Sequence, residues 1–410
     1  MRSNLMEKVL LFVSLAEGFA AMTIFAYGPL YMRQVLFEPN LTIASLSLGL
    51  AQLCIFLFAG LWGRLGDWSR RPLHLVTLGL CGISGATLGL SLVGSSLPFL
   101  SLIVLYGLFA AAVAPLAMAW MTLHNRDKAA RQTARYYRMR ALGWAVSSLG
   151  AGALIDGFAA TGYVYAFRLC AVLTLLAAAI LGAMLAFDKK AAHGAPEPTP
   201  PTELPEPAAP AGINAPAKGS ILLRLLPVAL VCVLGFGGYS AFSAMLGPYL
   251  TEHLAGQSAQ VGYAMGLMSA VEILCMAPVG RLADRLSPAR ILLYGAGGYM
   301  LMYALIFVVS NPWAVVALLA LPVFPFMATG ATGVFAAMTT AAQRGEAMGI
   351  YEASAALGGF AGSLVAGAVS EAVGLIAVPI LSFLLFGAAA VILYRRVIPQ
   401  SKAGQPMTVR

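Results

Sequence analysis

The sequence predicts an all-α membrane protein whose 12 transmembrane helices form two pseudo-symmetric six-helix bundles. Of its residues, 60% are hydrophobic and 10% charged, and the mean hydropathy is +0.84, unlike an ordinary soluble domain. A helix of roughly 20 mainly apolar residues crosses the hydrocarbon core and satisfies its own backbone there. A charged loop motif that occurs twice indicates that the second half repeats the first.

Twelve segments are long and apolar enough, and we expect each to form one membrane-spanning helix. They are residues 8–31, 41–63, 73–94, 98–123, 137–158, 164–186, 221–246, 259–280, 290–310, 312–338, 347–370 and 374–395.

The longest break between these segments is residues 188–220, where eight prolines alternate with Ala and Glu. Such a composition cannot form a packed core, so we expect an extended cytoplasmic linker. The predicted domains are therefore an N-terminal bundle (1–187), the linker (188–220), a C-terminal bundle (221–398) and a cytoplasmic tail (399–410).

The basic residues predict the orientation. Of 25 Lys and Arg, only Arg33 and Arg168 lie outside the termini, the loops after even-numbered segments and the adjoining helix ends. Positive residues stay on the cytoplasmic side, so both termini are expected there, in a multi-pass protein of a bacterial inner membrane. The densest cluster, between Arg126 and Arg140, is interpreted as a topology signal, with contact to anionic lipid or to a partner as the alternative. The net charge of +9 has the same origin and therefore does not indicate nucleic-acid binding. We expect the lipid bilayer, and no nucleic acid, as a partner.

Neither a metal site nor an enzyme is indicated. The five cysteines all lie inside apolar segments, without a Cys-x-x-Cys pair or a neighbouring His. The four histidines are scattered, and no nucleophile motif or phosphate-binding loop precedes a folded domain. We expect no catalytic residue, no metal and no cofactor.

The internal repeat extends beyond the loop motif. Gly63-Arg-Leu-Gly-Asp67 recurs as Gly280-Arg-Leu-Ala-Asp284, a shift of 217 residues. Gly28-Pro29 recurs 219 residues later as Gly247-Pro248. Finally, Gly143, Gly152 and Asp156 are matched by Gly358, Gly367 and Glu371 at a shift of 215. Three landmarks in one register favour a six-plus-six duplication.

With these motifs the chain resembles the major facilitator superfamily, in particular its 12-helix efflux and sugar-efflux-like members. Gly63, Asp67 and Arg71 match the signature loop between helices two and three, and Gly280, Asp284 and Arg285 match its second copy. The resemblance implies that these residues form a conformational gate which holds the cytoplasmic side shut, with Asp67 docked near the start of helix eleven. Trp68, Arg70 and Pro72 depart from the family pattern, which makes Arg71 a less secure match than Asp67.

Acidic residues inside the predicted helices are the candidates for proton coupling. A charge at the bilayer centre costs a few kcal/mol or more, so such residues usually face a cavity or a partner. Glu17 and Glu272 lie near the middle of their segments, and Glu352 lies about one and a half turns into helix eleven. Each of the three either carries a proton or makes a buried hydrogen bond between helices.

The resemblance also implies a central cavity lined by helices one, four, seven and ten. Tyr27, Tyr31, Tyr106 and Tyr239 are then candidate substrate contacts, with helix packing as the alternative interpretation. Helix four lacks the membrane-embedded Arg of drug:proton antiporters and helix five lacks their Gly-Pro pair. The cavity carries no Lys or Arg cluster, so a neutral or amphipathic small molecule fits better than a highly anionic one.

The function expected from these observations is secondary active transport of a small organic solute by alternating access, as proton-coupled efflux. The scaffold is shared with proton-coupled importers of sugar or nucleoside type, which remain an alternative. A lipid flippase and a non-transporting sensor are further alternatives. A sensor usually carries a folded soluble domain, and the largest soluble stretch expected here is the linker. A flippase needs a lateral opening between helices, whereas the small-residue faces at Gly143 and Gly358 favour close packing. We expect a monomer.

Overall fold

The computed structural model describes residues 2–69, 71–124, 129–187, 221–339 and 343–398. The linker 188–220 and the tail 399–410 lie outside the described residues, so the domain boundaries stay a prediction. The described residues form helices and no strand. Twelve of these helical stretches are long and apolar enough to cross a membrane, which confirms the expected fold class.

The first six spans follow one another without interruption. They are α1 (Arg2–Gln34), α2 (Leu41–Ser69), α3 (Pro72–Leu90), α4 (Ser96–His124), α5 (Ala129–Phe158) and α6 (Ala160–Phe187). The second six are α8 (Ile221–Pro248) with the short π-helix η2 (Tyr249–His253), α9 (Ser258–Arg285), α10 (Pro288–Val308), the pair α11 (Pro312–Leu319) and α12 (Phe324–Ala337), α13 (Arg344–Val373), and α14 (Ala377–Ile392) with η4 (Leu393–Val397).

Most helix ends differ from the predicted bounds by a few residues, and two differences bear on the architecture. The tenth segment is broken between α11 and α12, where Pro322 and Pro325 each remove a backbone donor and stop the first helix from continuing. Helix α5 begins at Ala129 rather than at 137, because the basic stretch before the apolar segment is also helical. The extra turns place Arg140 three turns inside the helix, with consequences for the site.

Each half is a bundle of helices, and an equivalent pair of helices packs closely in both halves. α1 packs on α5 in the first half, and α8 packs on α13 in the second. Gly143 makes the first crossing possible, because a Cβ there would lie 2.3 Å from the carbonyl oxygen of Leu15. Gly358 makes the second possible, with a corresponding distance of 2.4 Å to the oxygen of Val233. The glycines matched by the repeat thus occupy equivalent places in the structure.

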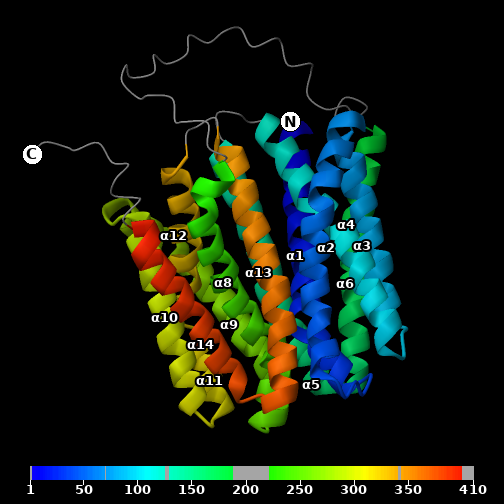
Figure 1. Cartoon of the computed structure of the whole chain (residues 1–410). Helices are drawn as coiled ribbons and strands as arrows, with labels where there is room; N and C mark the ends of the chain where they lie inside the picture. The colour runs from blue at the N-terminus through cyan, green and yellow to red at the C-terminus, as the bar shows by residue number, and fades with distance from the viewer. Residues whose placement is uncertain (1, 70, 125–128, 188–220, 340–342, 399–410) are drawn as a thin grey trace, which may run out of the picture.

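The two halves meet through α5 with α9 and through α2 with α13. The closest approaches are at Gly152 to Gly262 and at Gly367 to Thr42, far from the ends where α1 begins and η4 ends. We call that end the termini face and the other end the opposite face. Nearer the termini face, an added Cβ at Gly60 of α2 or Gly349 of α13 would meet nothing within 4 Å. The halves therefore converge at the opposite face and diverge toward the termini face, as the courses of α2 and α13 in Figure 1 show.

Candidate functional site

The crossing of α1 and α5 is lined by polar contacts along its length. Ser14 donates to the carbonyl of Tyr136 at 2.7 Å, and Tyr27 donates to the carbonyl of Ser148 at 2.8 Å. Between them the hydroxyls of Thr23 and Ser147 are 2.7 Å apart. Side-chain hydrogen bonds of this kind join helices where lipid offers no alternative partner. The crossing is thus a rigid frame for the charged pair at its centre.

That pair is Glu17 of α1 and Arg140 of α5. Arg140 Nη2 donates to Glu17 Oε1 at 2.9 Å, and Nε lies 2.8 Å from Oε2. Glu17 is only 1% exposed, and the guanidinium also lies 5.5 Å from the ring centre of Trp144. A two-pronged contact between guanidinium and carboxylate is the strongest ion-pair geometry that side chains offer. Glu17, predicted as a proton carrier, is therefore held in its place by a cation.

Two aromatic hydroxyls and one further acid surround the pair. Tyr106 of α4 and Tyr136 of α5 are fully buried, close enough for the charge of Glu17 to act on both. The hydroxyl of Tyr106 has no hydrogen-bond partner among the described residues. Glu352 of α13 is exposed, and the charge of Arg140 acts on its carboxylate. The structure thus brings two of the three predicted acids to one arginine, from opposite halves.

Arg140 was missed as a site residue by the sequence interpretation. Arg140 belongs to the basic cluster that predicts the topology, and the apolar segment predicts a helix that begins only at 137. Two features point to Arg140: the helix already begins at Ala129, and Gly143 lies about one turn after Arg140. Gly18 of α1 completes the close approach, since a Cβ there would lie 2.4 Å from the backbone oxygen of Arg140.

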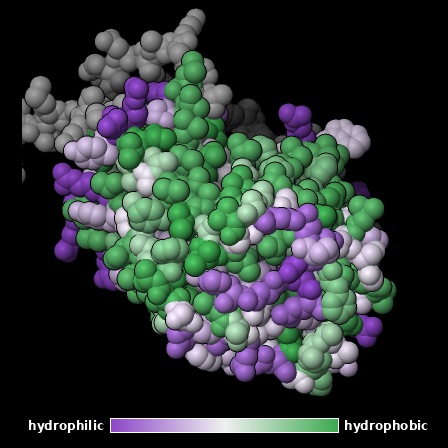
Figure 2. All heavy atoms as spheres, turned by 60° about the horizontal axis from the view of Figure 1, so that its bottom comes forward, coloured by the Kyte–Doolittle hydropathy of each residue, from purple (hydrophilic) through white to green (hydrophobic). Residues whose placement is uncertain are grey.

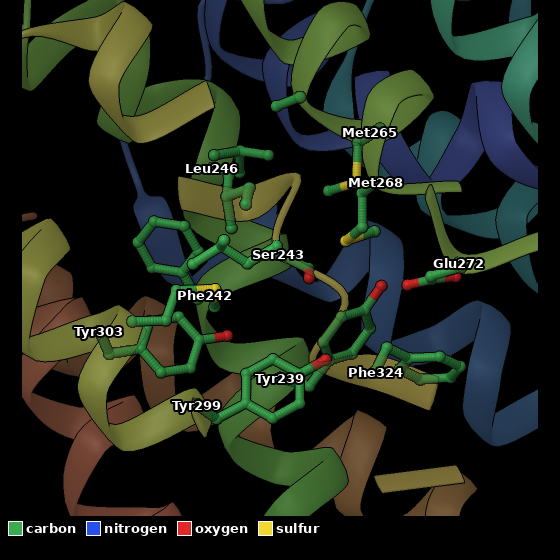
Figure 3. Close-up of a pocket in the computed structure, with 14 residues that line it drawn as sticks. Tyr239, Phe242, Ser243, Leu246, Met265, Met268, Glu272, Tyr299, Tyr303 and Phe324 are labelled. Carbon is green, nitrogen blue, oxygen red and sulfur yellow. The ribbon is translucent and has the colours of Figure 1, made fainter. Parts of the chain in front are cut away.

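Glu272 lies apart from this pair, in a pocket of the C-terminal half. The pocket is lined by aromatic and methionine side chains with few polar groups: Tyr239, Phe242, Ser243, Leu246, Ala264, Met265, Met268, Glu272, Tyr299, Met302, Tyr303, Leu319, Leu321 and Phe324. In Figure 3 the hydroxyl of Tyr239 and the carboxylate of Glu272 point toward one another. Glu272 Oε1 is buried without a hydrogen-bond partner among the described residues.

Of the four predicted cavity tyrosines, only Tyr239 lines this pocket. Tyr31 donates to the backbone of Val93 and packs against Phe99 and Phe167. Tyr27 is buried in the α1–α5 crossing, and Tyr106 lies beside Glu17. For these three the structure favours packing within the N-terminal half.

The predicted gate motifs lie at the termini face. Gly63 and Gly280 have open space where a Cβ would stand, and Arg71 and Arg285 are exposed. The side chains of Asp67 and Asp284 lie outside the described residues, so their contacts stay a prediction. Trp68, which replaces a basic residue of the family pattern, is 84% exposed. Among the residues that the structure describes, no ion pair joins the halves at this face.

The opposite face, in contrast, is closed by polar contacts between the halves. Arg33 of α1 makes two hydrogen bonds to Glu252 of η2, at 2.8 and 2.7 Å. The hydroxyl of Thr42 donates to Glu371 at 3.1 Å. Figure 2 shows hydrophilic side chains gathered on this face beside the apolar flank. The signal for this closure was the unusual position of Arg33, one of two basic residues outside the expected pattern.

A bridging amide completes the closure. The side-chain oxygen of Gln34 accepts from Tyr163 at 2.8 Å and from Ser258 of the other half at 3.2 Å. These three residues, with Asp156, line an open polar cavity of about 470 Å³ at the opposite face. The halves are thus fastened to one another at the opposite face and lie apart toward the termini face (Figure 1).

Comparisons with known proteins agree with this architecture. A family model described as Major Facilitator Superfamily matches residues 9–328 and 228–409. A bacterial homologue of the human lysosomal transporter Spinster, in an inward-facing and occupied conformation, superposes with a TM-score of 0.75, 13% identity and coverage of 98% of both chains. The peptide transporter POT in complex with sulfate gives a TM-score of 0.77 at 15% identity, over 98% of this chain and 95% of its own. None of the curated proteins matches the sequence. The chain belongs to the Major Facilitator Superfamily.

Proposed function

We propose that this protein exports a small amphipathic organic solute in exchange for protons, by alternating access of its two halves. Family membership and the transporter fold support secondary transport. The observation that carries the coupling is the buried Glu17–Arg140 pair with Glu352 of the other half within electrostatic reach. No cofactor beyond a proton gradient and no second copy of the chain is needed.

The coupling step uses Arg140 as the moving cation. In the described state Arg140 is paired with Glu17, and no ion pair within 4 Å joins it to Glu352. When a proton binds Glu17, the charge that holds Arg140 is cancelled, and Glu352 attracts the guanidinium across the opening. The new pair draws α5 toward α13 and closes the termini face. An ionised and a protonated Glu17 thus favour different conformations, as coupling requires.

The predicted orientation determines from which side the solute would be loaded in the described state. The distribution of basic residues favours a cytoplasmic termini face, so the described state is open to the cytoplasm. A solute loaded there leaves on the other side once the Arg33–Glu252 contact parts. An importer with the same coupling would use the same states in the reverse order.

The test is a flux assay on the full chain in proteoliposomes containing a pH-sensitive dye. The solutes are 2-phenylethylamine, phenyl β-glucoside and uridine, which represent an amphipathic amine, a neutral glycoside and a nucleoside. We expect an outward solute gradient to drive opposite proton movement for at least one of them. Glu17→Gln and Glu352→Gln should abolish this exchange, whereas Glu346→Gln, a change at an exposed carboxylate in the first turn of α13, should leave it intact.

Two outcomes contradict the proposal. If proton and solute move in the same direction, the protein is a symporter and efflux by exchange is wrong. If a solute moves without any proton movement, and a pH gradient fails to concentrate it, the coupling itself is wrong.

A further inference from the structure

The pocket around Glu272 has the dimensions and the walls of a site for one small cationic group. The space it encloses is about 10 Å³, roughly enough for a single water molecule. Its aromatic rings pack against one another. The ring centre of Tyr239 lies 5.6 Å from that of Phe324 and 6.2 Å from that of Tyr299, and the ring centre of Tyr299 lies 4.4 Å from that of Phe386, on which it stacks. A group larger than a water molecule does not fit without moving these rings.

The carboxylate in this pocket lacks a cationic partner among the described residues. No described ion pair includes Glu272, and its Oε1 atom is buried without a hydrogen bond. The titratable groups that face it are the phenols of Tyr239 and Tyr299, which are neutral at physiological pH when unperturbed. Glu272 as a residue is partly exposed, but a carboxylate oxygen buried without a partner is unfavourable. The carboxyl group therefore either holds a proton or binds a cation from outside.

The walls favour a cation over a second water molecule. Aromatic faces attract ammonium groups through the ring quadrupole, and several aromatic rings line this pocket. A primary ammonium has the size of a water molecule and three N–H donors. Those donors match the Glu272 carboxylate and the hydroxyls of Tyr239 and Tyr299. A quaternary ammonium offers no donor and is too large for the space.

One wall of the pocket also touches the N-terminal half. Tyr239 stacks on Phe25 of α1 at 6.4 Å, so the ring that covers Glu272 also contacts the N-terminal half. An apolar body attached to the ammonium can lie along Phe25 and Phe324 while the charged end enters the pocket. The flexible side chains of Met265 and Met268 also line the pocket and can adjust to the entry (Figure 3).

We propose that this pocket binds the primary ammonium group of the transported solute, with Glu272 as its counter-ion. The inference rests on the proposed transport function and names its substrate class as amphipathic primary amines. When the ammonium enters, the proton on Glu272 leaves for water at the open face, so one cation replaces another in the pocket. Glu272 is then the substrate-binding acid, and Glu17 with Glu352 remain the pair that moves Arg140.

The test measures binding by titration calorimetry on the full chain in lipid nanodiscs. The probes are 2-phenylethylamine, its N,N,N-trimethyl derivative and 2-phenylethanol. We expect the primary amine to bind about tenfold or more tightly than either of the others. Glu272→Gln should weaken amine binding by about tenfold and remove the discrimination, and Tyr299→Phe should weaken it less. Glu346→Gln is the control and should bind as wild type does.

The inference is overturned if the three probes bind equally, if Glu272→Gln binds the amine as wild type does, or if the amine fails to bind at about 10 mM. Failure of the proposed function is separate. Amine binding that depends on Glu272 without any flux in proteoliposomes would contradict transport and keep the site. Proton-coupled flux of a neutral solute that is unchanged in Glu272→Gln would keep transport and contradict the site.

Discussion

The two halves share one scaffold and carry their buried acids in different places. At the α1–α5 crossing the centre is the Glu17–Arg140 ion pair. At the equivalent α8–α13 crossing, the repeat puts Phe236 at the position of Glu17, and Phe236 packs edge-on against Tyr351 at 5.9 Å. In the pocket of the second half the acid is Glu272 on α9, and the corresponding position of α2 is Ile55. The glycines that set helix packing are repeated, and the charges are not.

This difference separates structural residues from functional ones. Gly143 and Gly358 are kept in both halves because both crossings need backbone contact. Burying an ion pair in the membrane costs desolvation free energy. An aromatic pair such as Phe236 and Tyr351 can stabilise a helix crossing by packing alone, so the crossing does not need an ion pair for stability. The presence of the ion pair in only one half therefore indicates a function rather than a need of the fold, namely the exchange of Arg140 between Glu17 of its own half and Glu352 of the other half. Glu272, unpaired in the other half, indicates a second task.

Removing the cation Arg140 should cause the largest loss of stability, and this loss should arise in the N-terminal half. Arg140→Leu leaves Glu17 buried without a partner, and we expect about 3–5 kcal/mol of destabilisation. Thermal unfolding of the purified protein measures this. Glu272→Gln, which removes no cation, should change stability by less than about 1 kcal/mol. If both variants unfold at the wild-type temperature, the two acids do not differ as described.

The double variant Glu17→Leu with Arg140→Leu sharpens this result. Because no unpaired charge remains, its stability should return most of the way to wild type. Proton exchange should still be absent in proteoliposomes. A double variant as unstable as Arg140→Leu would show that packing by Arg140 against Trp144, rather than charge, holds the crossing.

The second prediction concerns the shared scaffold and should affect both halves alike. A Cβ at Gly143 or Gly358 would lie closer than 2.5 Å to a backbone oxygen, so Gly→Ala forces the helices apart. We expect each variant to lose about 1–3 kcal/mol in thermal unfolding. Gly150→Ala and Gly157→Ala are matched controls on α5, because nothing lies within 4 Å of the added atom. They should be neutral or slightly stabilising, as alanine favours a helix by roughly 1 kcal/mol. Unequal losses at Gly143 and Gly358 would contradict the equivalence of the crossings.

The fold was predictable because its signals are dispersed over the whole chain. Twelve apolar segments and a repeat in constant register specify two bundles, even though α5 begins eight residues earlier than expected and α11 and α12 are broken at proline. The site was less predictable because partners are set by helix rotation and depth. Glu17 was identified from its position alone, while Arg140 was hidden among residues that set topology. The unpaired state of Glu272 depends on which side chains face it, and periodicity does not reveal that.

The smallest expected effect lies at the contact between the halves at the opposite face. Arg33 and Glu252 are 20% and 33% exposed in their side chains, so the pair contributes less than about 1 kcal/mol and weakens with salt. Arg33→Ala should therefore leave thermal unfolding almost unchanged and shift the balance of open and closed states. A cysteine at Ile155, which lines the adjoining cavity, reports the shift by reacting faster with a water-soluble maleimide. The charge-swapped pair Arg33→Glu with Glu252→Arg should return the rate toward wild type, because the ion pair can form in reverse. An unchanged rate in Arg33→Ala would assign the closure to Gln34, Tyr163 and Ser258 instead, and Gln34→Ala then becomes the variant that opens the face.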